Sequence, residues 1–389
     1  MAYDFEQAVN RRNTNSTKWD NIPVNPNAIP MWVADMDFLC PPEVAQAIRQ
    51  RLDHEIFGYT PEPKEFRQAV SNWQKTRHNW DIGDAHVMGV TSVVPAMFCA
   101  VRAYTQPGDK VLVQRPVYGP FTRSIVEQGR EAVSSGLVQT ADGWEIDFVD
   151  LEQKLSDPAV KMMFLCNPHN PVGRVYTRQE LEKIYDLCQK HNVVIFADEI
   201  HSDFVYADHT HVSMGALHTK GVITAIAPSK TFNLASLKTA VMICADEELW
   251  GPFKKDGELT GLGNVNIFGH IATVAAYTHG AAYVDAMMQH LTENVEILCR
   301  ELETIPQINM MKPEGTYLMW LDCRALGLKN DELVAFFANE AGVSMNGGTF
   351  FGPEGDGFVR MNIACPHATV CQAMQQIRSA VEKRALATV

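Results

Sequence analysis

The sequence predicts an α/β protein built around a mostly parallel β-sheet that is covered by helices. Short apolar runs at 111–113, 162–166, 193–197, 222–227 and 240–244 alternate along the chain with amphipathic stretches. Several of these runs are apolar on both faces, which is typical of strands buried in a covered parallel sheet. Alternation of strand and helix also favours parallel strands joined by right-handed crossovers.

The clearest of the intervening helices is predicted at 178–191. Its apolar residues recur with the period of an amphipathic helix: Leu181, Ile184, Tyr185 and Cys188. Thr177 precedes this run as a predicted N-cap. Glu180, three residues later, is placed to complete a capping box.

A second domain is predicted because the chain, at 389 residues, exceeds the usual size of a single core. From about residue 284 a long helix (283–304) leads into short strands (317–321, 358–363) and a last helix (367–383). This pattern is typical of a smaller α+β domain, and we expect the irregular first 45 residues to pack on it. The predicted large domain spans 46–283, and the small domain combines 1–45 with 284–389.

Charge and cysteine usage exclude several classes of protein. The net charge is −13, which disfavours binding to nucleic acid or to an anionic membrane. The nine cysteines are scattered without a Cys-x-x-Cys pair, so we expect reduced thiols, a cytoplasmic location and no metal site. His209 and His211 are expected in a solvated loop. The chain begins without a signal-peptide pattern, and we find no apolar run of about 18 residues that would span a membrane.

Polar clusters follow three of the predicted strands. The run at 162–166 leads into Asn170, the run at 193–197 into Asp198 and His201, and the run at 222–227 into Lys230. Ligands of open α/β sheets bind outside the carboxyl ends of the strands, so we expect these four side chains to meet in one crevice. A lysine beside an apolar site has a lowered pKa and is a nucleophile when neutral. The alternative is that each cluster is an ordinary turn.

Three motifs resemble those of fold-type I pyridoxal 5′-phosphate (PLP) enzymes, the aspartate aminotransferase superfamily (class I/II). They are Trp-Val-Ala-Asp-Met-Asp-Phe at 32–38, Asp-Glu-Ile-His-Ser-Asp at 198–203 and Ser-Lys-Thr-Phe-Asn-Leu-Ala at 229–235. Within the superfamily they are similar to the MalY/PatB-type cystathionine β-lyases and cysteine-S-conjugate β-lyases. The resemblance covers nearly the whole chain. It implies a large domain with a mostly parallel seven-stranded sheet plus a smaller α+β domain.

The resemblance implies a role for each polar residue at the strand ends. Lys230 matches the lysine that holds PLP covalently and then moves the substrate's Cα proton. Asp198 matches the carboxylate that keeps the pyridine nitrogen protonated. Asn170 matches the side chain that donates to the ring O3′, and His201 stands where many aminotransferases carry a tyrosine. Tyr118 matches the aromatic residue that stacks on the ring.

The phosphate of PLP is expected at the start of a helix that follows a strand-like run at 86–90. The matching residues of that turn are Ser92, Val93 and Val94, whose N–H groups would face the phosphate. Ser92 replaces the usual glycine, and Lys238 stands where arginine is common. Ser229 adds a hydroxyl donor. Tyr59 matches a tyrosine that reaches the phosphate of the neighbouring subunit, which implies a homodimer with shared active sites.

The expected substrate is a small amino acid. Arg360 matches the arginine that binds the substrate α-carboxylate, and strand periodicity turns it away from its apolar neighbours. Ala34 and Asp35 lie in the segment that lines the substrate pocket in the family, where we expect a backbone role for them.

The resemblance implies a PLP-dependent carbon–sulfur lyase that cleaves L-cystathionine or related cysteine S-conjugates to a thiol, pyruvate and ammonia. An aminotransferase of the same fold is the alternative, because both reactions begin with removal of the Cα proton. A regulatory protein that acts through protein contact is a further alternative. Its partner contact would survive the substitution Lys230→Ala, whereas catalysis would not.

Overall fold

A seven-stranded sheet forms the centre of the computed structural model, which describes residues 3–141 and 143–387. The strand order is β2-β10-β9-β8-β7-β3-β4. In chain order these strands are β2 (His86–Val90), β3 (Lys110–Val113), β4 (Glu131–Ser134), β7 (Val160–Cys166), β8 (Val194–Asp198), β9 (Val222–Ile226) and β10 (Ala240–Cys244). β10 runs antiparallel to both of its neighbours, and the other pairs are parallel. The predicted mostly parallel seven-stranded sheet is confirmed.

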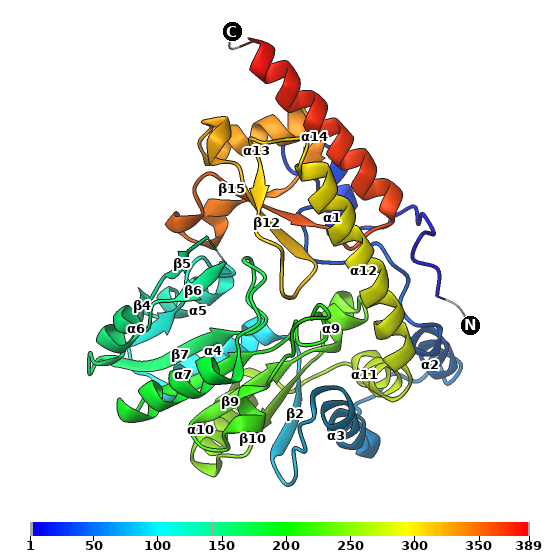
Figure 1. Cartoon of the computed structure of the whole chain (residues 1–389). Coiled ribbons are helices and arrows are strands. Elements are labelled where there is room, and N and C mark those ends of the chain that lie inside the picture. The colour runs from blue at the N-terminus through cyan, green and yellow to red at the C-terminus, as the bar shows by residue number, and fades with distance from the viewer. Residues whose placement is uncertain (1–2, 142, 388–389) are drawn as a thin grey trace.

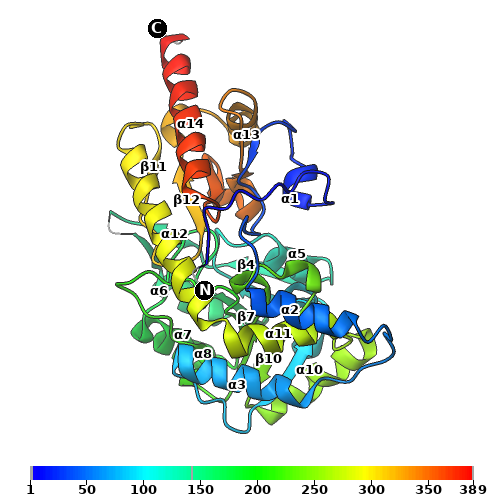
Figure 2. The same ribbon diagram turned by 90° about the vertical axis from the view of Figure 1, so that its right-hand side faces the viewer.

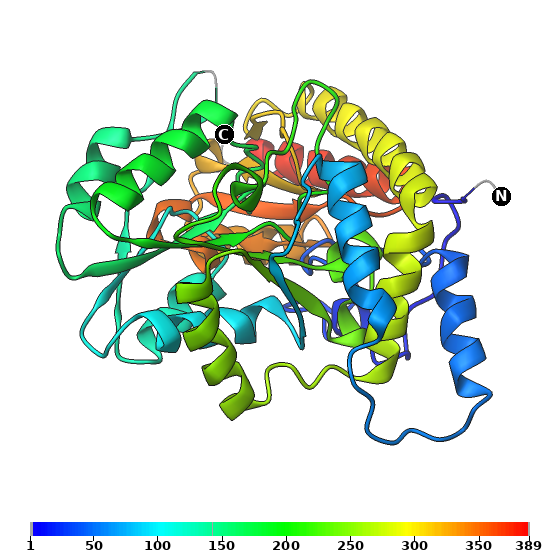
Figure 3. The same ribbon diagram turned by 90° about the horizontal axis from the view of Figure 1, so that it is seen from below.

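Helices cover both faces of this sheet because its inner strands are apolar on both sides (Figure 3). Alternate residues of β7 enter two cores: Phe164 packs with α4 and α10, whereas Leu165 packs with α6 and α7. The helices of this region are α3 (Lys64–His78), α4 (Val93–Tyr104), α5 (Pro120–Val126), α6 (Phe148–Leu155), α7 (Arg178–Lys190), α8 (Met214–Leu217), α9 (Pro228–Thr231), α10 (Glu247–Thr260) and α11 (Ile267–His279). The hairpin β5 (Leu137–Gln139) and β6 (Trp144–Ile146) lies beside them.

A four-stranded antiparallel sheet of order β11-β12-β15-β14 forms the second layer, drawn above the first in Figure 1. Its strands are β11 (Asn309–Met310), β12 (Leu318–Asp322), β14 (Asn346–Gly347) and β15 (Phe358–Asn362). The helices α12 (Ala281–Leu302), α13 (Asn330–Asn339) and α14 (His367–Ala387) pack with it. The predicted domain borders at 45/46 and 283/284 fall inside α2 (Pro42–Leu52) and α12. We therefore propose borders just before these two helices.

The N-terminal segment links the two layers (Figure 2). It contains α1 (Thr17–Asp20), pairs β1 (Ile29–Pro30) with β13 (Val343–Ser344), and continues into α2, which lies on α11. Asn362 of β15 donates to the carbonyl oxygens of Val33 and Asp35 at 2.6 and 2.8 Å. The segment is thereby held across the gap between the sheets.

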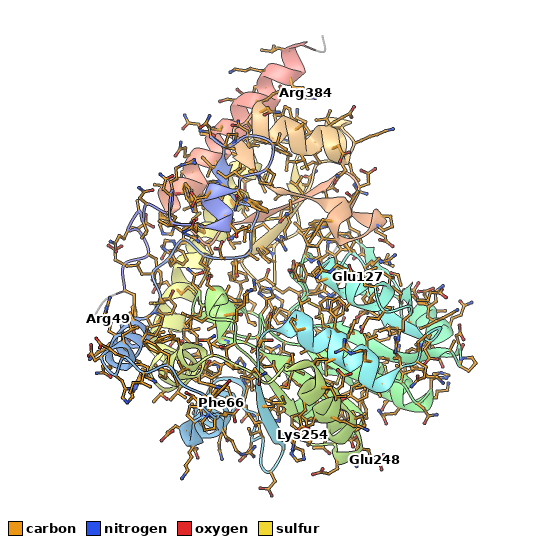
Figure 4. The ribbon with its side chains drawn as sticks, turned by 180° about the vertical axis from the view of Figure 1, so that it is seen from behind. Arg49, Phe66, Glu127, Glu248, Lys254 and Arg384 are labelled. Atoms are coloured by element: carbon orange, nitrogen blue, oxygen red, sulfur yellow. The ribbon has the colours of Figure 1, made fainter. Side chains whose placement is uncertain are left out.

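Charged side chains lie on the outer helices, as Glu248 and Lys254 on α10 show in Figure 4. Within the described part of the chain, no helix combines the length and the apolar character needed to cross a bilayer.

The expectation of a solvated loop at His211 is wrong. Its ring is buried, and Nε2 lies 3.2 Å from Glu199 Oε2.

Candidate active site

Lys230 lies in α9, one turn after β9 ends. Its Nζ donates to the carbonyl oxygen of Ala34 at 2.8 Å. The next residue, Thr231, donates to the buried Asp203 at 2.7 Å and fixes the turn. Burial, assisted by the positive charge of Arg360, lowers the pKa of Lys230 to about 8. A substantial fraction of this amine is therefore neutral, and nucleophilic, near physiological pH.

Asp198 ends β8, in register with Cys166 of β7 and Ala225 of β9. Its side chain is buried, and Oδ1 accepts a hydrogen bond from the Ile200 N–H at 3.2 Å. Burial raises the pKa of Asp198 to about 7. A carboxyl group in this setting gains from a cationic hydrogen-bond donor, because such a partner restores the charged form.

Asn170, His201 and Tyr118 line the same cavity as Lys230 and Asp198. The Oδ1 atom of Asn170 accepts from Arg360, which leaves its amide NH2 group to donate. His201 is buried, and neither ring nitrogen has a hydrogen-bond partner among the described residues. Burial lowers the pKa of His201, so its ring is neutral and carries one donor and one acceptor.

Arg360 projects from β15 into the cavity with its guanidinium almost wholly enclosed; the residue is 3% exposed. It donates to Asn170 Oδ1 at 3.0 Å, to the Trp32 carbonyl at 3.0 Å and to Asn346 Oδ1 at 2.7 Å. All three acceptors are neutral, and no carboxylate of the described residues pairs with it. Burial lowers the pKa of Arg360 to about 10. A buried, unpaired cation of this kind is a binding site for a carboxylate.

The start of α4 forms another wall of the cavity. Ser92 is the N-cap residue, and its hydroxyl does not cap the helix. The N–H groups of Val93 and Val94 belong to the first helical turn, which has no carbonyl partners within the helix. Ser229 and the exposed Lys238 line the cavity together with this turn. The N-terminus of α4, the hydroxyls of Ser92 and Ser229, and the ammonium group of Lys238 together form a site for an anion.

Ala34 and Asp35 differ in their placement. Ala34 lines the cavity, and its carbonyl oxygen accepts from Lys230 and from the Tyr317 hydroxyl, at 2.8 and 2.9 Å. The Asp35 carboxylate forms a 2.7 Å ion pair with Arg11 and does not line the cavity. Its carbonyl oxygen accepts from Lys18 and from Asn362.

Tyr59 lies away from the cavity of its own chain. Its ring is fully exposed in the irregular segment between α2 and α3. Ile56 and Phe57 beside it are exposed too, at 65% and 56%. This segment therefore presents an apolar surface outward, and Tyr59 does not contribute to the site within one chain.

Several residues of the cavity wall were not predicted as site residues. Trp32 and Ile200 belong to the motifs at 32–38 and 198–203. Each lies within two residues of a predicted site residue, Ala34 or His201, and this closeness in sequence could have identified them. Asn346 lies opposite Arg360 in the pairing of β14 with β15. Further residues that line the cavity come from helices, loops and strand ends: Val33, Thr91, Phe121, Cys166, Ala235, Thr239, Ala240 and Phe350.

The residues present fit PLP. The cavity holds about 310 Å³ and contains an amine of lowered pKa, a buried acid, an aromatic ring and an anion site on α4. The unpartnered ring nitrogens of His201 are available to a polar ligand, because buried polar groups without hydrogen bonds are costly. Lys230 would hold the aldehyde carbon, Asp198 the pyridine nitrogen, and the start of α4 the phosphate.

Comparison with known proteins identifies the family of the chain. A model of the aminotransferase class I and II family matches residues 27–377. The chain is 39% identical to the cystathionine β-lyase PatB of Bacillus subtilis (strain 168), over 97% of this chain and 100% of that protein. It is 31% identical to protein MalY of Escherichia coli (strain K12), over 97% and 99%.

A solved structure is similar over nearly the whole fold. Cystalysin from Treponema denticola, which contains a pyridoxal 5′-phosphate cofactor, superposes with a TM-score of 0.95 at 33% sequence identity. The superposition covers 98% of this chain and 100% of that one.

Proposed function

Because this chain belongs to the aminotransferase class I and II family of fold-type I PLP enzymes, we propose that it is a carbon–sulfur β-lyase. Its proposed substrates are L-cystathionine and related cysteine S-conjugates, which it cleaves to a thiol, pyruvate and ammonia. The observation that carries the proposal is the meeting of Lys230, Asp198 and the unpaired Arg360 in one cavity. The similarity to cystathionine β-lyases and to cystalysin favours lyase chemistry over amino transfer.

Each charged residue has one task in this proposal. Bound PLP supplies a carbonyl that captures the substrate amine and an electron sink for the charge left when the Cα proton departs. Arg360 binds the α-carboxylate with its guanidinium and so orients the Cα–H bond. Lys230, once its amine is free, takes the Cα proton. Asp198 holds a proton on the ring nitrogen throughout.

Loss of the β-thiolate follows from removal of the Cα proton, because the electrons of the Cα–H bond can then expel the sulfur. Trp32, Ile200 and Phe350 give the cavity apolar surface. We propose that this surface accommodates the side chain beyond sulfur, with Tyr118 against the cofactor ring.

We propose further that the active unit is a homodimer. Tyr59 and its exposed apolar neighbours are supported as interface residues by their exposure within one chain. In this arrangement Tyr59 contributes to the phosphate site of the partner subunit.

We also propose a cytoplasmic location, which agrees with the presence of several buried free thiols such as Cys99, Cys166 and Cys188.

Incubation of the purified holoprotein with L-cystathionine tests the activity. The proposal expects equal amounts of free thiol and pyruvate, and neither product from Lys230→Ala. A different result, conversion of the bound cofactor to pyridoxamine phosphate with restoration by a 2-oxo acid and no thiol, would identify an aminotransferase instead.

A further inference from the structure

The segment 32–36, which lies between β1 and α2, has its backbone carbonyl oxygens held by side chains. Each carbonyl from Trp32 to Met36 accepts at least one such hydrogen bond. The donors, in the order of the carbonyls, are Arg360; Asn362; Lys230 with Tyr317; Lys18 with Asn362; and Arg11 with Asn233. Two cations that the proposed reaction does not use, Arg11 and Lys18, are therefore part of this arrangement.

Lys18, in α1, is the more unusual of these two cations, because its side chain is only 1% exposed. Its ammonium group donates to Asp37 Oδ2 at 2.8 Å and to the Asp35 carbonyl oxygen at 3.1 Å. Removing an ammonium group from water is costly, and a buried ion pair adds little net stability compared with apolar residues of the same volume. The burial of Lys18 thus points to a role in fixing the position of its partners.

Two aspartates of the motif at 32–38 connect Lys18 with Arg11. Asp37 accepts from Lys18 through Oδ2 and from Arg11 through Oδ1, at 2.8 and 2.7 Å. Arg11 also pairs with Asp35 Oδ2 at 2.7 Å. We call these four residues the Lys18 cluster. Their ion pairs hold both cations against the backbone of the segment.

Ala34 is the point at which the Lys18 cluster meets the active site. Its carbonyl oxygen accepts from Lys230 Nζ at 2.8 Å, and the next carbonyl along the chain, that of Asp35, accepts from Lys18. Only two soft dihedral angles separate adjacent peptide planes, so a fixed Asp35 carbonyl limits how far the Ala34 carbonyl can turn. The direction of the Lys230 amine therefore depends on contacts made outside the cavity.

We propose that Lys18 and Arg11 are positioning residues for Lys230, and that they act by fixing the Ala34 carbonyl that receives its amine. The proposal rests on the proposed function, in which Lys230 takes the Cα proton once its amine is free. A displacement of about 1 Å at such a step can cost on the order of a hundredfold in rate. Lys18 and Arg11 do not line the cavity, so they act through the segment and not by contact with substrate.

Exchange of the Cα proton of L-alanine for deuterium tests the proposal, followed by NMR in D2O with the PLP-loaded holoprotein. L-Alanine offers a carboxylate to Arg360 but has no sulfur to lose, so the assay measures proton removal in a lyase and in an aminotransferase alike. Cystathionine cleavage is not measured, and failure of the proposed lyase reaction would leave the result standing.

In Lys18→Met we expect the exchange rate at saturating alanine to fall about tenfold or more. The alanine concentration for half-saturation should change by less than about twofold, because Arg360 is intact. Arg11→Gln should lower the rate in the same direction. The Arg11 side chain is 20% exposed, so this variant carries the test if Lys18→Met does not fold.

The matched control is Lys110→Met, the same substitution in a lysine that also pairs with a carboxylate, that of Asp157 at 3.0 Å. Lys110 begins β3, at the opposite end of the parallel strands from Asp198, so its exchange rate should equal that of the unmodified protein. The proposal is overturned if folded, PLP-loaded variants of the Lys18 cluster exchange the proton as fast as the control does. It is also overturned if the half-saturating concentration rises as the rate falls, because the effect would then lie in substrate binding.

Discussion

Lys230 experiences opposing electrostatic influences whose balance sets its reactivity. Burial and the charge of Arg360 favour the neutral amine, whereas Asp35 and Asp198 favour the ammonium. The first two outweigh the second, and the pKa falls to about 8. The hydrogen bond to the Ala34 carbonyl directs the amine without adding a charge.

This lowered pKa predicts how the apoprotein captures PLP. Only the neutral amine attacks the aldehyde, so the rate should rise with pH through about 8 and level off above it. With that pKa the neutral fraction grows from about one tenth at pH 7 to about nine tenths at pH 9, which is about a tenfold increase in rate. Stopped-flow absorbance of the apoprotein mixed with PLP measures it. A rate that still climbs steeply between pH 9 and 10 would show an unperturbed lysine.

Arg360 is predicted to account for much of the affinity for the α-carboxylate. Removing a hydrogen bond between charged groups costs about 1.5–3 kcal/mol, so Arg360→Gln should lower kcat/KM by about 10- to 100-fold. The free energy of unfolding should change little, because removal of a buried cation that has no anionic partner offsets the loss of its three hydrogen bonds. Steady-state kinetics and urea unfolding measure the two effects. The exposed Arg178→Gln is the control, and equal kinetics for the two variants would contradict the assignment.

At the scale of residues, the site residues that follow the central strands could be predicted from the sequence. Those on the opposite wall of the active-site cavity could not. Asn170, Asp198 and Lys230 follow apolar strands, and the geometry of parallel sheets brings such positions together. Asn346 lies in the two-residue strand β14 and Phe350 in the short 3-10 helix Gly348–Phe351, and both elements are too short to show a periodic pattern. Their position depends on the pairing of β14 with β15, which the local sequence does not specify.

Among the elements, the segment 32–38 depends on asparagines for its position. Asn233, in the turn after α9, receives the Met36 N–H at 3.0 Å and donates to the carbonyls of Met36 and Phe38 at 2.9 Å. Its φ of 58° is left-handed, a conformation that asparagine tolerates better than most residues. The turn that carries Lys230 and the segment that accepts its hydrogen bond are thus fastened together.

Asn233→Ala is therefore predicted to lower the free energy of unfolding by about 3–4 kcal/mol. Three lost hydrogen bonds cost about 1 kcal/mol each, and alanine adds strain in the left-handed region. Asn233→Gly loses the same bonds without the strain and should be about 1 kcal/mol less destabilised. Urea unfolding of the apoproteins measures both. Equal stability of the two variants would show that backbone conformation is unimportant at this turn.

Elements with strong local patterns were predicted closely, whereas strand direction was not. The capping box of Thr177 and Glu180 is present, and α7 ends within one residue of the predicted helix. The run at 240–244 is a strand as predicted, but β10 is antiparallel. A strand that is apolar on both faces reads the same in either direction, so its orientation follows from the connection and not from the pattern.

For the whole molecule, the proposed dimer predicts complementation between two inactive or impaired variants. A Lys230→Ala subunit lacks the amine, and a Tyr59→Ala subunit lacks the residue proposed to serve its partner. In a hybrid dimer, the site with an intact Lys230 receives an intact Tyr59. Mixing the two variants after subunit exchange should therefore give lyase activity above the average of the separate proteins. Activity that merely averages would place Tyr59 outside the partner's site.

Mapping the covalent attachment of PLP tests the central claim most directly. The holoprotein is reduced with borohydride, digested, and searched by mass spectrometry for the phosphopyridoxyl group. The structure predicts that the group is found on Lys230, in the peptide that follows β9, and that Lys238 is unmodified. Label on another lysine, or a protein that retains no PLP, would contradict the assignment of Lys230 as the amine on which the proposed reaction depends.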